Sequence, residues 1–141
     1  MISILVLPQA LRAQLAAEAQ EALPRECCGL IEGVRDFDCV RALTLHPTAN
    51  FCADAHSFEI DPAAHLRLRR EARVAGHEIV GCYHSHPNGQ AMPSAHDRAF
   101  EGQEGFLWLI AALGESGSPV VFAAFEGAYF REISLAERAG A

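Results

Sequence analysis

Two histidines, His84 and His86, stand two residues apart where a predicted strand ends. Alternate side chains of a strand point to the same face with Cα atoms roughly 7 Å apart, so two long imidazoles can converge on one metal ion. Taken alone, such a pair is as often two surface or core histidines as a metal site. Cys82 shares this face, but it would lie about 13 Å from His86 along a straight strand. We therefore interpret Cys82 as a small buried residue.

Asp97 is the candidate for a third ligand, at the start of the helix that follows. Ser94 and Asp97 also fit a capping box, which stabilises a helix without any catalytic role. The short loop at residues 87–93 would bring the helix start back over the strand end, where Asp97 can join His84 and His86. Two histidines and a carboxylate with an open fourth position are the ligand set of a catalytic zinc, whose bound water has a pKa of about 7.

Apolar runs and turn residues predict the elements that must position these side chains. Strands are predicted at residues 2–7, 28–32, 37–45, 77–86, 106–113, 119–125 and 128–134, with a turn at 33–36 and a brief extended piece at 58–60. Helices are predicted at residues 8–23, 62–75 and 94–101, the second with Asp61 as its N-cap. Because strands run consecutively at the end of the chain, the sequence predicts an α/β (α+β) fold with a mixed sheet flanked by helices, not a doubly wound parallel sheet.

The length of 141 residues and the hydrophobic content of 50% predict a single domain over residues 1–141. All 11 basic residues are arginine and the net charge is −7, which argues against binding nucleic acid or anionic lipid by bulk attraction. The sequence contains neither the roughly 18 apolar residues of a membrane span nor a secretion signal. Five cysteines with one adjacent pair make a poor disulfide framework. A cytoplasmic protein that does not enter a membrane is therefore predicted.

A further carboxylate, Glu26, begins the run Glu-Cys-Cys-Gly-Leu-Ile-Glu-Gly at residues 26–33. Taken alone it would be one more solvated carboxylate at a turn. Together with His-x-His-Pro at residues 84–87 and with Ser94 and Asp97, this run resembles the JAMM (MPN+) metalloprotease family. The spacing His-x-His-x7-Ser-x2-Asp is met without a gap, and the resemblance covers nearly the whole chain.

The resemblance implies a cytidine-deaminase-like MPN/JAMM fold and one Zn²⁺ per chain. His84, His86 and Asp97 look like the zinc ligands, with water in the fourth position. Glu26 looks like the general base that activates this water and then passes the proton to the leaving amine. Ser94 looks like the hydroxyl donor that supports the tetrahedral oxyanion.

Members of this family generally cut a peptide or isopeptide bond after the carboxy-terminal glycine of ubiquitin or a related β-grasp protein. The chain looks too short for the insertions of eukaryotic deubiquitinating members and is similar to small stand-alone prokaryotic members. We therefore expect a zinc hydrolase that acts on the Gly-Gly tail of a ubiquitin-like or sulfur-carrier protein. The tail can add as a strand beside residues 46–60, where Asn50, Phe51 and Phe58 are candidate substrate contacts. An ordinary surface loop with two anchoring phenylalanines explains the same residues.

Three other functions stay open on the sequence alone. Two histidines and a carboxylate can hold Fe(II) in an oxygenase, although that function gives Glu26 and Ser94 no task. The His-x-His-Pro run also resembles RadC-type proteins, against which the acidic charge balance and residues 26–29 weigh. A non-catalytic MPN scaffold usually lacks the ligands that are present here. The other histidines are interpreted as surface or local polar contacts (His46, His56, His65, His77 and His96), although His96, beside Asp97, can also line the site. Cys27 and Cys28 are interpreted as buried thiols at the start of a core strand.

Overall fold

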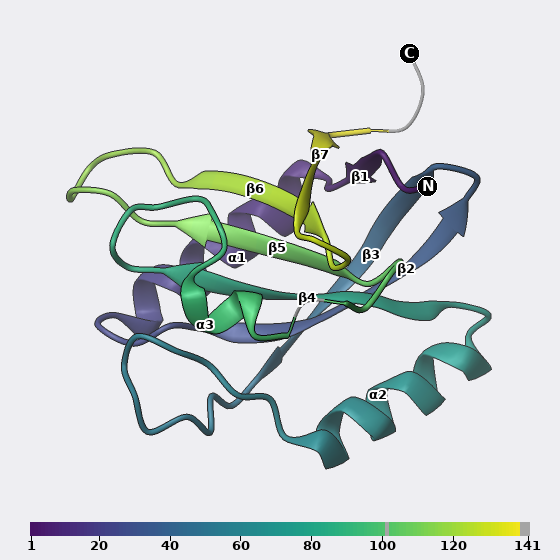
Figure 1. The fold of residues 1–141 in the computed structure, drawn as a ribbon, viewed down its shortest axis with the longest axis horizontal. Helices are drawn as coiled ribbons and strands as arrows, with labels where there is room; N and C mark the ends of the chain where they lie inside the picture. Colours follow the sequence, from purple (N-terminus) through teal and green to yellow (C-terminus); the bar gives the residue numbers. More distant parts are fainter. Residues whose placement is uncertain (101, 139–141) are drawn as a thin grey trace.

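A mixed sheet of seven strands forms the body of the molecule, and in the computed structural model it curls until its two outer strands meet (Figure 1). The structure describes residues 1–100 and 102–138. Within them, the strands are β1 (Ile4–Val6), β2 (Cys28–Asp36), β3 (Cys39–Thr48), β4 (Glu78–His86), β5 (Leu107–Ala112), β6 (Val121–Glu126) and β7 (Arg131–Ala136), and the helices are α1 (Gln9–Ala22), α2 (Pro62–Val74) and α3 (Ala95–Arg98).

The strands lie in the order β1-β3-β2-β4-β5-β6-β7, and a parallel pairing of β1 with β7 closes the sheet into a barrel. β1 is also parallel to β3, and β4 to β5, whereas the other neighbours are antiparallel. The predicted mixed sheet with flanking helices is therefore confirmed. The closure was not predicted, because it joins Ile4 to Ser134 from opposite ends of the chain, and no local pattern reports such a pairing.

The hairpin between β2 and β3 is longer than predicted. The turn predicted at residues 33–36 was wrong, because β2 continues to Asp36 and the chain reverses at residues 37–38. A register shift between Glu32 and Gly33 lets the strand continue through the glycine. A side chain at Gly33 would overlap the backbone carbonyl of Arg41, so the glycine allows two strands to approach closely instead of ending one of them.

Two shorter predictions also need correction. The helix predicted at residues 94–101 is reduced to α3, a single turn over Ala95–Arg98, and residue 101 lies outside the described residues. The piece at residues 58–60 is not a strand in the structure. Phe58 is instead a loop residue whose side chain packs into the apolar core beside β4 and β5. Its burial therefore does not depend on strand pairing.

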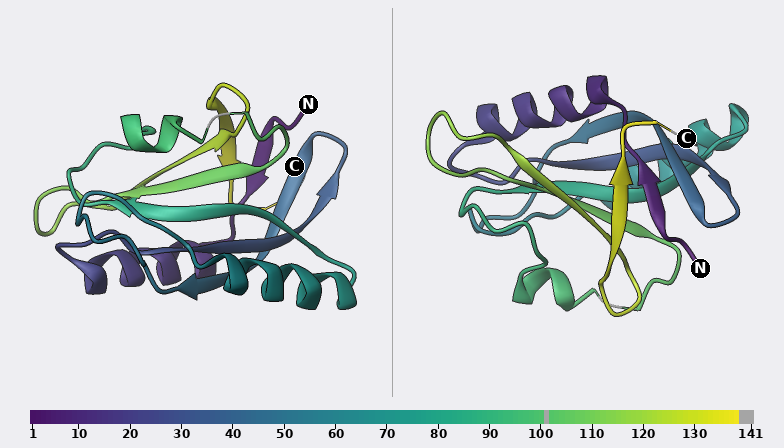
Figure 2. Two further views of the ribbon diagram at one scale, coloured as in Figure 1. Left: turned by 60° about the horizontal axis from the view of Figure 1, so that its bottom comes forward. Right: turned by 90° about the horizontal axis from the view of Figure 1, so that it is seen from above.

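Two apolar cores lie on opposite sides of β4. The first contains Leu15 of α1 and Tyr83 of β4, whose hydroxyl donates a hydrogen bond of 2.7 Å to Glu18 of α1. The second contains Leu68 of α2 and Cys82 of β4. α1 and α3 accordingly lie on opposite sides of the sheet (Figure 2). The alternation of β4 therefore turns its histidine positions away from α1.

No helix among residues 1–100 and 102–138 combines the length and the apolar character needed to cross a membrane. Each of the five cysteines is a free thiol in this part of the chain. Cys28 and Cys82 are buried as predicted, whereas Cys27 is only partly buried. The cysteines therefore contribute apolar packing and no cross-links.

Candidate metal centre

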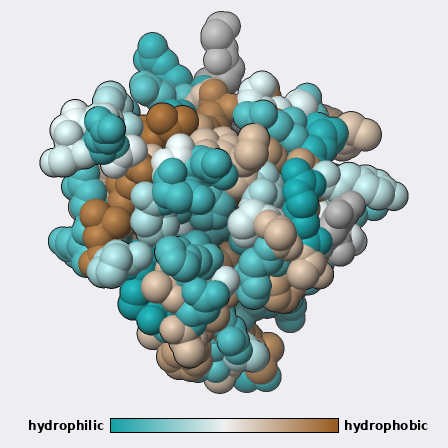
Figure 3. Space-filling view, turned by 60° about the vertical axis from the view of Figure 1, so that its left-hand side comes forward, coloured by the Kyte–Doolittle hydropathy of each residue, from teal (hydrophilic) through white to brown (hydrophobic). Residues whose placement is uncertain are grey.

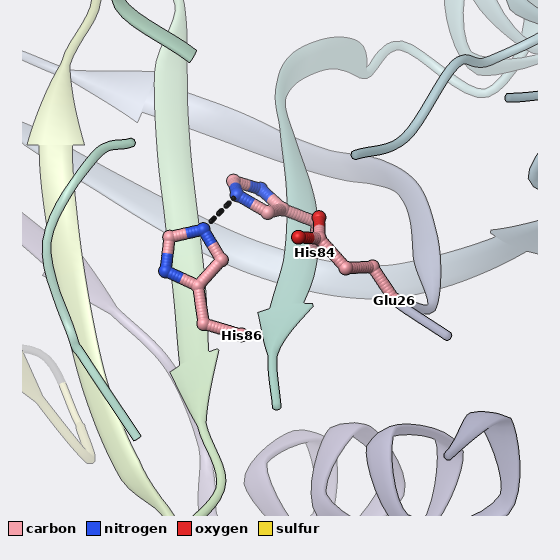
Figure 4. A group of neighbouring side chains, drawn as sticks. All are labelled: Glu26, His84 and His86. Atoms are coloured by element: carbon pink, nitrogen blue, oxygen red, sulfur yellow. Dashed lines mark hydrogen bonds between the residues drawn. The ribbon is translucent and has the colours of Figure 1, made fainter. Parts of the chain in front are cut away.

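Strand β4 brings the two imidazoles of the predicted site to one point. The Nε2 atoms of His84 and His86 lie 2.9 Å apart, and the exposed fractions of the two residues are 0% and 4%. Figure 4 shows the rings turned toward each other, with the carboxylate of Glu26 beside them. Because β4 is paired with β2 on one side and β5 on the other, the backbone that carries both rings is fixed.

Asp97 reaches the same point from α3. Its Oδ2 atom lies 3.1 Å from Nε2 of His84 and 3.3 Å from Nε2 of His86. The same oxygen accepts a hydrogen bond of 2.8 Å from the backbone N–H of Ser94, while Oγ of Ser94 accepts from the N–H of Asp97 at 3.1 Å. The capping box predicted from the sequence is therefore confirmed. The cap also orients the carboxylate toward the histidines.

These three atoms fit a divalent metal ion. They form a triangle with edges of 2.9, 3.1 and 3.3 Å, and a tetrahedral ion bound at roughly 2.0–2.1 Å separates its ligand atoms by about 3.3 Å. Nδ1 of His86 lies 2.8 Å from the carbonyl oxygen of Gln90 and must donate to it, which leaves the lone pair of Nε2 for a metal. Nδ1 of His84 is buried and has no hydrogen-bond partner among the described residues. The donor set is therefore that of a metal site.

The pKa shifts of His84 and Asp97 also suit a metal site, because they favour a neutral imidazole and an ionised carboxylate. Burial lowers the pKa of His84 despite its hydrogen bond with Asp97. Burial acts in the same direction on His86, but the hydrogen bonds with Asp97 and Gln90 outweigh it, so the pKa of His86 is raised. Burial would raise the pKa of Asp97, yet the hydrogen bonds from both histidines hold that pKa well below its usual range. Asp97 is therefore ionised, as metal ligation requires.

Glu26 lies in the segment between α1 and β2 and turns its carboxylate into the same site. The carboxylate and the ring nitrogens of His84 and His86 all lie within 4.8 Å of one another. Only 5% of Glu26 is exposed, and burial raises its pKa to about 7, with opposing effects from the positive charge of His86 and the negative charge of Asp97. A carboxyl with such a pKa can both accept and return a proton near neutral pH.

The backbone around Glu26 is attached to β4 by Ser85, the residue between the two histidines. Oγ of Ser85 accepts a hydrogen bond of 2.9 Å from the N–H of Cys27, and the N–H of Ser85 donates to the carbonyl of Cys27 at 3.1 Å. Sequence reasoning assigned no role to Ser85. Its place between two predicted ligands, on the opposite face of the strand, was the signal that could have identified it.

A small cavity of about 60 Å³ opens beside the histidines. Glu26, His86 and Ser94 line it together with residues of the two neighbouring loops (His56, Pro87, Asn88, Gln90 and Met92). The hydroxyl of Ser94 accepts from Asp97 and therefore keeps its own proton for a further acceptor. Figure 3 looks toward the end of the molecule where these loops lie, and hydrophilic residues cover much of this face beside a hydrophobic patch.

The three predicted substrate contacts differ in what they offer. Phe51 is 59% exposed. Phe58 is buried, and its ring stacks on the imidazole of His84 with centroids 4.3 Å apart. The amide of Asn50 makes hydrogen bonds within the chain, including one of 3.0 Å to the carbonyl of Glu26. The loop therefore supports the candidate site from behind and offers Phe51 to solvent.

Two histidines outside the site meet on one carboxylate. Nε2 of His46 and Nδ1 of His77 lie 2.8 and 2.6 Å from separate oxygens of Glu32. The prediction that these two histidines make local polar contacts is confirmed. Burial would raise the pKa of Glu32, but the hydrogen bonds from the two histidines outweigh it and lower that pKa.

Similarity to known proteins identifies the family of the chain. Residues 8–125 match the model of the prokaryotic homologs of the JAB domain. A desampylase of Haloferax volcanii is 30% identical over 138 residues, which cover 89% of this chain and 96% of the relative. A desampylase of Pyrococcus furiosus is 32% identical over 111 residues, covering 77% and 74%. A probable TtuB-protein conjugate cleaving protease of Thermus thermophilus is 30% identical over 95 residues, covering 67% of this chain and 61% of that protein.

Solved structures share the fold of this chain. The solution structure of a protein from Desulfitobacterium hafniense superposes with a TM-score of 0.79 at 30% identity, covering 94% of this chain and 90% of that one. A JAB1/MPN domain protein from Archaeoglobus fulgidus has the same fold, with a TM-score of 0.55 at 20% identity and coverage of 96% and 100%. The resemblance inferred from the motif is confirmed, and the chain is a hydrolase of the JAMM type. It belongs to the family of prokaryotic homologues of the JAB domain.

Proposed function

We propose that the chain is a zinc-dependent isopeptidase or peptidase that hydrolyses the bond after the carboxy-terminal glycine of a ubiquitin-like or sulfur-carrier β-grasp protein. The observation that carries this proposal is the convergence of His84, His86 and Asp97, with the buried carboxylate of Glu26 beside them. The names of the relatives, two desampylases and a conjugate-cleaving protease, support the same class of substrate.

One Zn²⁺ per chain is proposed, with His84, His86 and Asp97 as its ligands. When bound, zinc supplies a Lewis acid that polarises a carbonyl and lowers the pKa of water to about 7. Ser85 and the cap of α3 keep the ligand-bearing segments in place. The chain contributes a closed, preformed donor set, so little rearrangement is needed on binding.

Glu26 is proposed as the proton carrier. A carboxylate oxygen of Glu26 takes a proton from the attacking water as the new C–O bond forms. The same oxygen returns the proton to the leaving nitrogen as the C–N bond breaks, so the carboxylate is regenerated in each cycle. A pKa of about 7, raised by burial, suits both steps because neither protonation state is strongly favoured near neutral pH.

Ser94 is proposed as the hydrogen-bond donor to the oxyanion. Its hydroxyl lines the cavity next to Glu26 and His86, and its lone pair is already engaged by the N–H of Asp97. The hydroxyl proton is therefore directed away from the cap. Such a donor stabilises the charge that develops on the carbonyl oxygen, and its loss typically costs about 100-fold or more in rate.

A Gly-Gly tail is proposed as the substrate segment. The cavity of about 60 Å³ admits a peptide backbone with little room for side chains, which favours glycine at the scissile bond. The tail can approach as an extended strand along residues 46–60. Of the candidate contacts in this loop, Phe51 offers an exposed ring, whereas Asn50 and Phe58 contribute through the residues that they support.

The decisive experiment compares the wild type with Glu26→Gln. The substrate is a β-grasp protein that carries a peptide extension after its Gly-Gly. We expect about one zinc per chain in both proteins and hydrolysis only in the wild type, because glutamine cannot take the proton. Turnover retained by the variant would exclude Glu26 as the proton carrier, and bound iron with oxygen-dependent turnover would favour an oxygenase instead.

A further inference from the structure

Asn50 uses the whole hydrogen-bonding capacity of its side chain within the chain. Its amide nitrogen donates to the carbonyl oxygens of Glu26, at 3.0 Å, and Ser57, at 2.9 Å. Its amide oxygen accepts from the N–H groups of Cys52, at 2.9 Å, and Glu59, at 3.0 Å. An asparagine side chain has two N–H donors and an oxygen with two lone pairs, so none of this capacity is left for a substrate.

These four bonds connect two sides of the candidate site. On one side, Asn50 holds the backbone of Glu26, the proposed proton carrier. On the other, it holds the carbonyl of Ser57, directly before Phe58, whose ring stacks on His84 at an interplanar angle of 21°. The side-chain amide of Asn50 therefore links the backbone of Glu26 to the segment that carries Phe58, the ring stacked on His84.

The position of Glu26 in the chain makes this link important. Pairing of β2 with β4 begins at Cys28, and the bonds to Ser85 reach only as far as Cys27. Among the described residues, Asn50 is the one hydrogen-bond partner of the carbonyl of Glu26. Rotation of this peptide would swing the attached carboxylate, and a displacement of about 1 Å in a catalytic group can cost about 100-fold in rate.

We propose that Asn50 is a positioning residue, which sets the carboxylate of Glu26 relative to His84 and His86 through the backbone of residue 26. This inference rests on the proposed function, since it assigns a role to a residue that acts through the proposed proton carrier. It differs from the expectation that Asn50 contacts the substrate, because a substrate contact would need hydrogen-bonding groups that are free.

Asn50→Asp separates the two halves of the amide. Aspartate keeps an oxygen that can accept from Cys52 and Glu59, so the loop keeps its internal bonds. It loses both donors and places a carboxylate against the carbonyls of Glu26 and Ser57. Asn50→Ala removes all four bonds without adding charge, so it carries the same comparison if the aspartate variant does not fold.

Steady-state kinetics on the extended β-grasp substrate test the proposal. For Asn50→Asp and Asn50→Ala we expect kcat to fall by about 10- to 100-fold, with KM within about twofold of the wild type and zinc content unchanged. Asp61→Ala is the matched control, because it removes the N-cap of α2 at the end of the same loop without touching Glu26. It should melt at a lower temperature than the wild type and keep its kcat. An increase in KM with normal kcat would overturn the proposal in favour of a substrate contact.

A double-mutant cycle tests whether Asn50 acts through Glu26. In single-turnover assays, adding Asn50→Asp to Glu26→Gln should change the residual rate by less than about twofold, because there is no longer a proton carrier to misplace. Independent, multiplicative losses would show that Asn50 acts on something else and would overturn the positioning role. If Glu26→Gln alone retains full activity, the proposed proton carrier fails first, and the positioning role fails with it.

Discussion

Ser94 and Asp97 each perform two tasks with the same few atoms. Oδ2 of Asp97 accepts from the N–H of Ser94 and also faces the nitrogens of His84 and His86. Oγ of Ser94 caps α3 and also lines the cavity. A helix of one turn has little stability of its own, so the cap is what presents the carboxylate to the site. The capping box that stabilises α3 therefore also positions a candidate metal ligand, Asp97, and a candidate hydrogen-bond donor, Ser94.

Ser94→Ala tests both tasks at once. Loss of the cap should lower the free energy of unfolding by about 1 kcal/mol, and loss of the hydroxyl donor should lower kcat by about 100-fold. Thermal denaturation, zinc content and kcat are measured together, with Ser94→Thr as a control that keeps a capping hydroxyl. Zinc retained with a low kcat supports the donor role. Zinc lost in parallel with kcat would instead assign the effect to the cap and to the orientation of Asp97.

At the scale of the elements, β4 is the strand on which the site depends, and its neighbours hold it in register. Near the candidate site, Ser85 connects β4 to the segment before β2. Near the other end, Glu32 of β2 binds His46 of β3 and His77, which directly precedes β4. One carboxylate therefore ties together three adjacent segments of the sheet. Its partners are only partly exposed, which protects these bonds from full solvent screening.

Glu32→Gln should destabilise the protein in a way that depends on pH. The hydrogen bonds from His77 and His46 lower the pKa of Glu32 below its usual value of 4.5, so the folded state favours the ionised form. This contribution is present above pH 4.5 and is lost as the pH falls through the lower, folded-state pKa. We expect the variant to be less stable than the wild type by about 1 kcal/mol at pH 7.

Urea denaturation of both proteins at several pH values measures this difference. The gap should narrow progressively below pH 4.5, where the wild type loses its advantage. A gap that is the same at every pH would mean that the charge of Glu32 contributes nothing and that only packing changed. Activity should be unaffected in the folded variant, since Glu32 pairs with Ile79 at the start of β4, whereas His84 and His86 lie at the end of that strand.

At the scale of the whole molecule, the closed sheet places its functional loops at one end. The loops at residues 49–61 and 87–94 supply His56, Asn88, Gln90 and Met92 to the wall of the cavity. Phe51 lies in the first of these loops and is largely exposed. If the tail of a substrate protein enters the cavity, the folded domain of that protein must contact the surface around the cavity. An exposed aromatic ring is a suitable contact residue for such an interface.

Phe51→Ala should raise KM for the extended β-grasp substrate by about tenfold and leave kcat nearly unchanged, because loss of one interface anchor typically costs more than about 1 kcal/mol. Phe37→Ala is the control. Phe37 is 97% exposed at the β2–β3 turn, so its replacement removes a similar ring from a different surface. An unchanged KM for Phe51→Ala, with the fold intact, would remove this loop from the proposed interface.

Local patterns predicted the elements and the candidate residues His84, His86, Ser94 and Asp97, whereas Glu26 was included only through the family resemblance. The alternation of β4, the cap of α3 and the spacing of His84, His86, Ser94 and Asp97 all depend on neighbours within about a dozen residues. The predicted end of a strand was wrong where pairing with another strand set the boundary, as at Gly33, which lies against the carbonyl of Arg41. Turn residues were read there as the end of a strand, but the sheet continued through them.

The sequence by itself determined the family, through the resemblance of its motif, and the mixed sheet and the chemical types of the side chains at the site, through hydrophobic pattern and short spacings. Only the tertiary structure decided that the carboxylate of Glu26 is buried beside histidines nearly 60 positions later in the chain. It also decided that the side-chain amide of Asn50 forms its hydrogen bonds within the chain, and that β1 pairs with β7 to close the sheet. Each of these depends on contacts between residues far apart in the chain. The energy of such contacts comes from packing and hydrogen bonds that no local pattern of residues records.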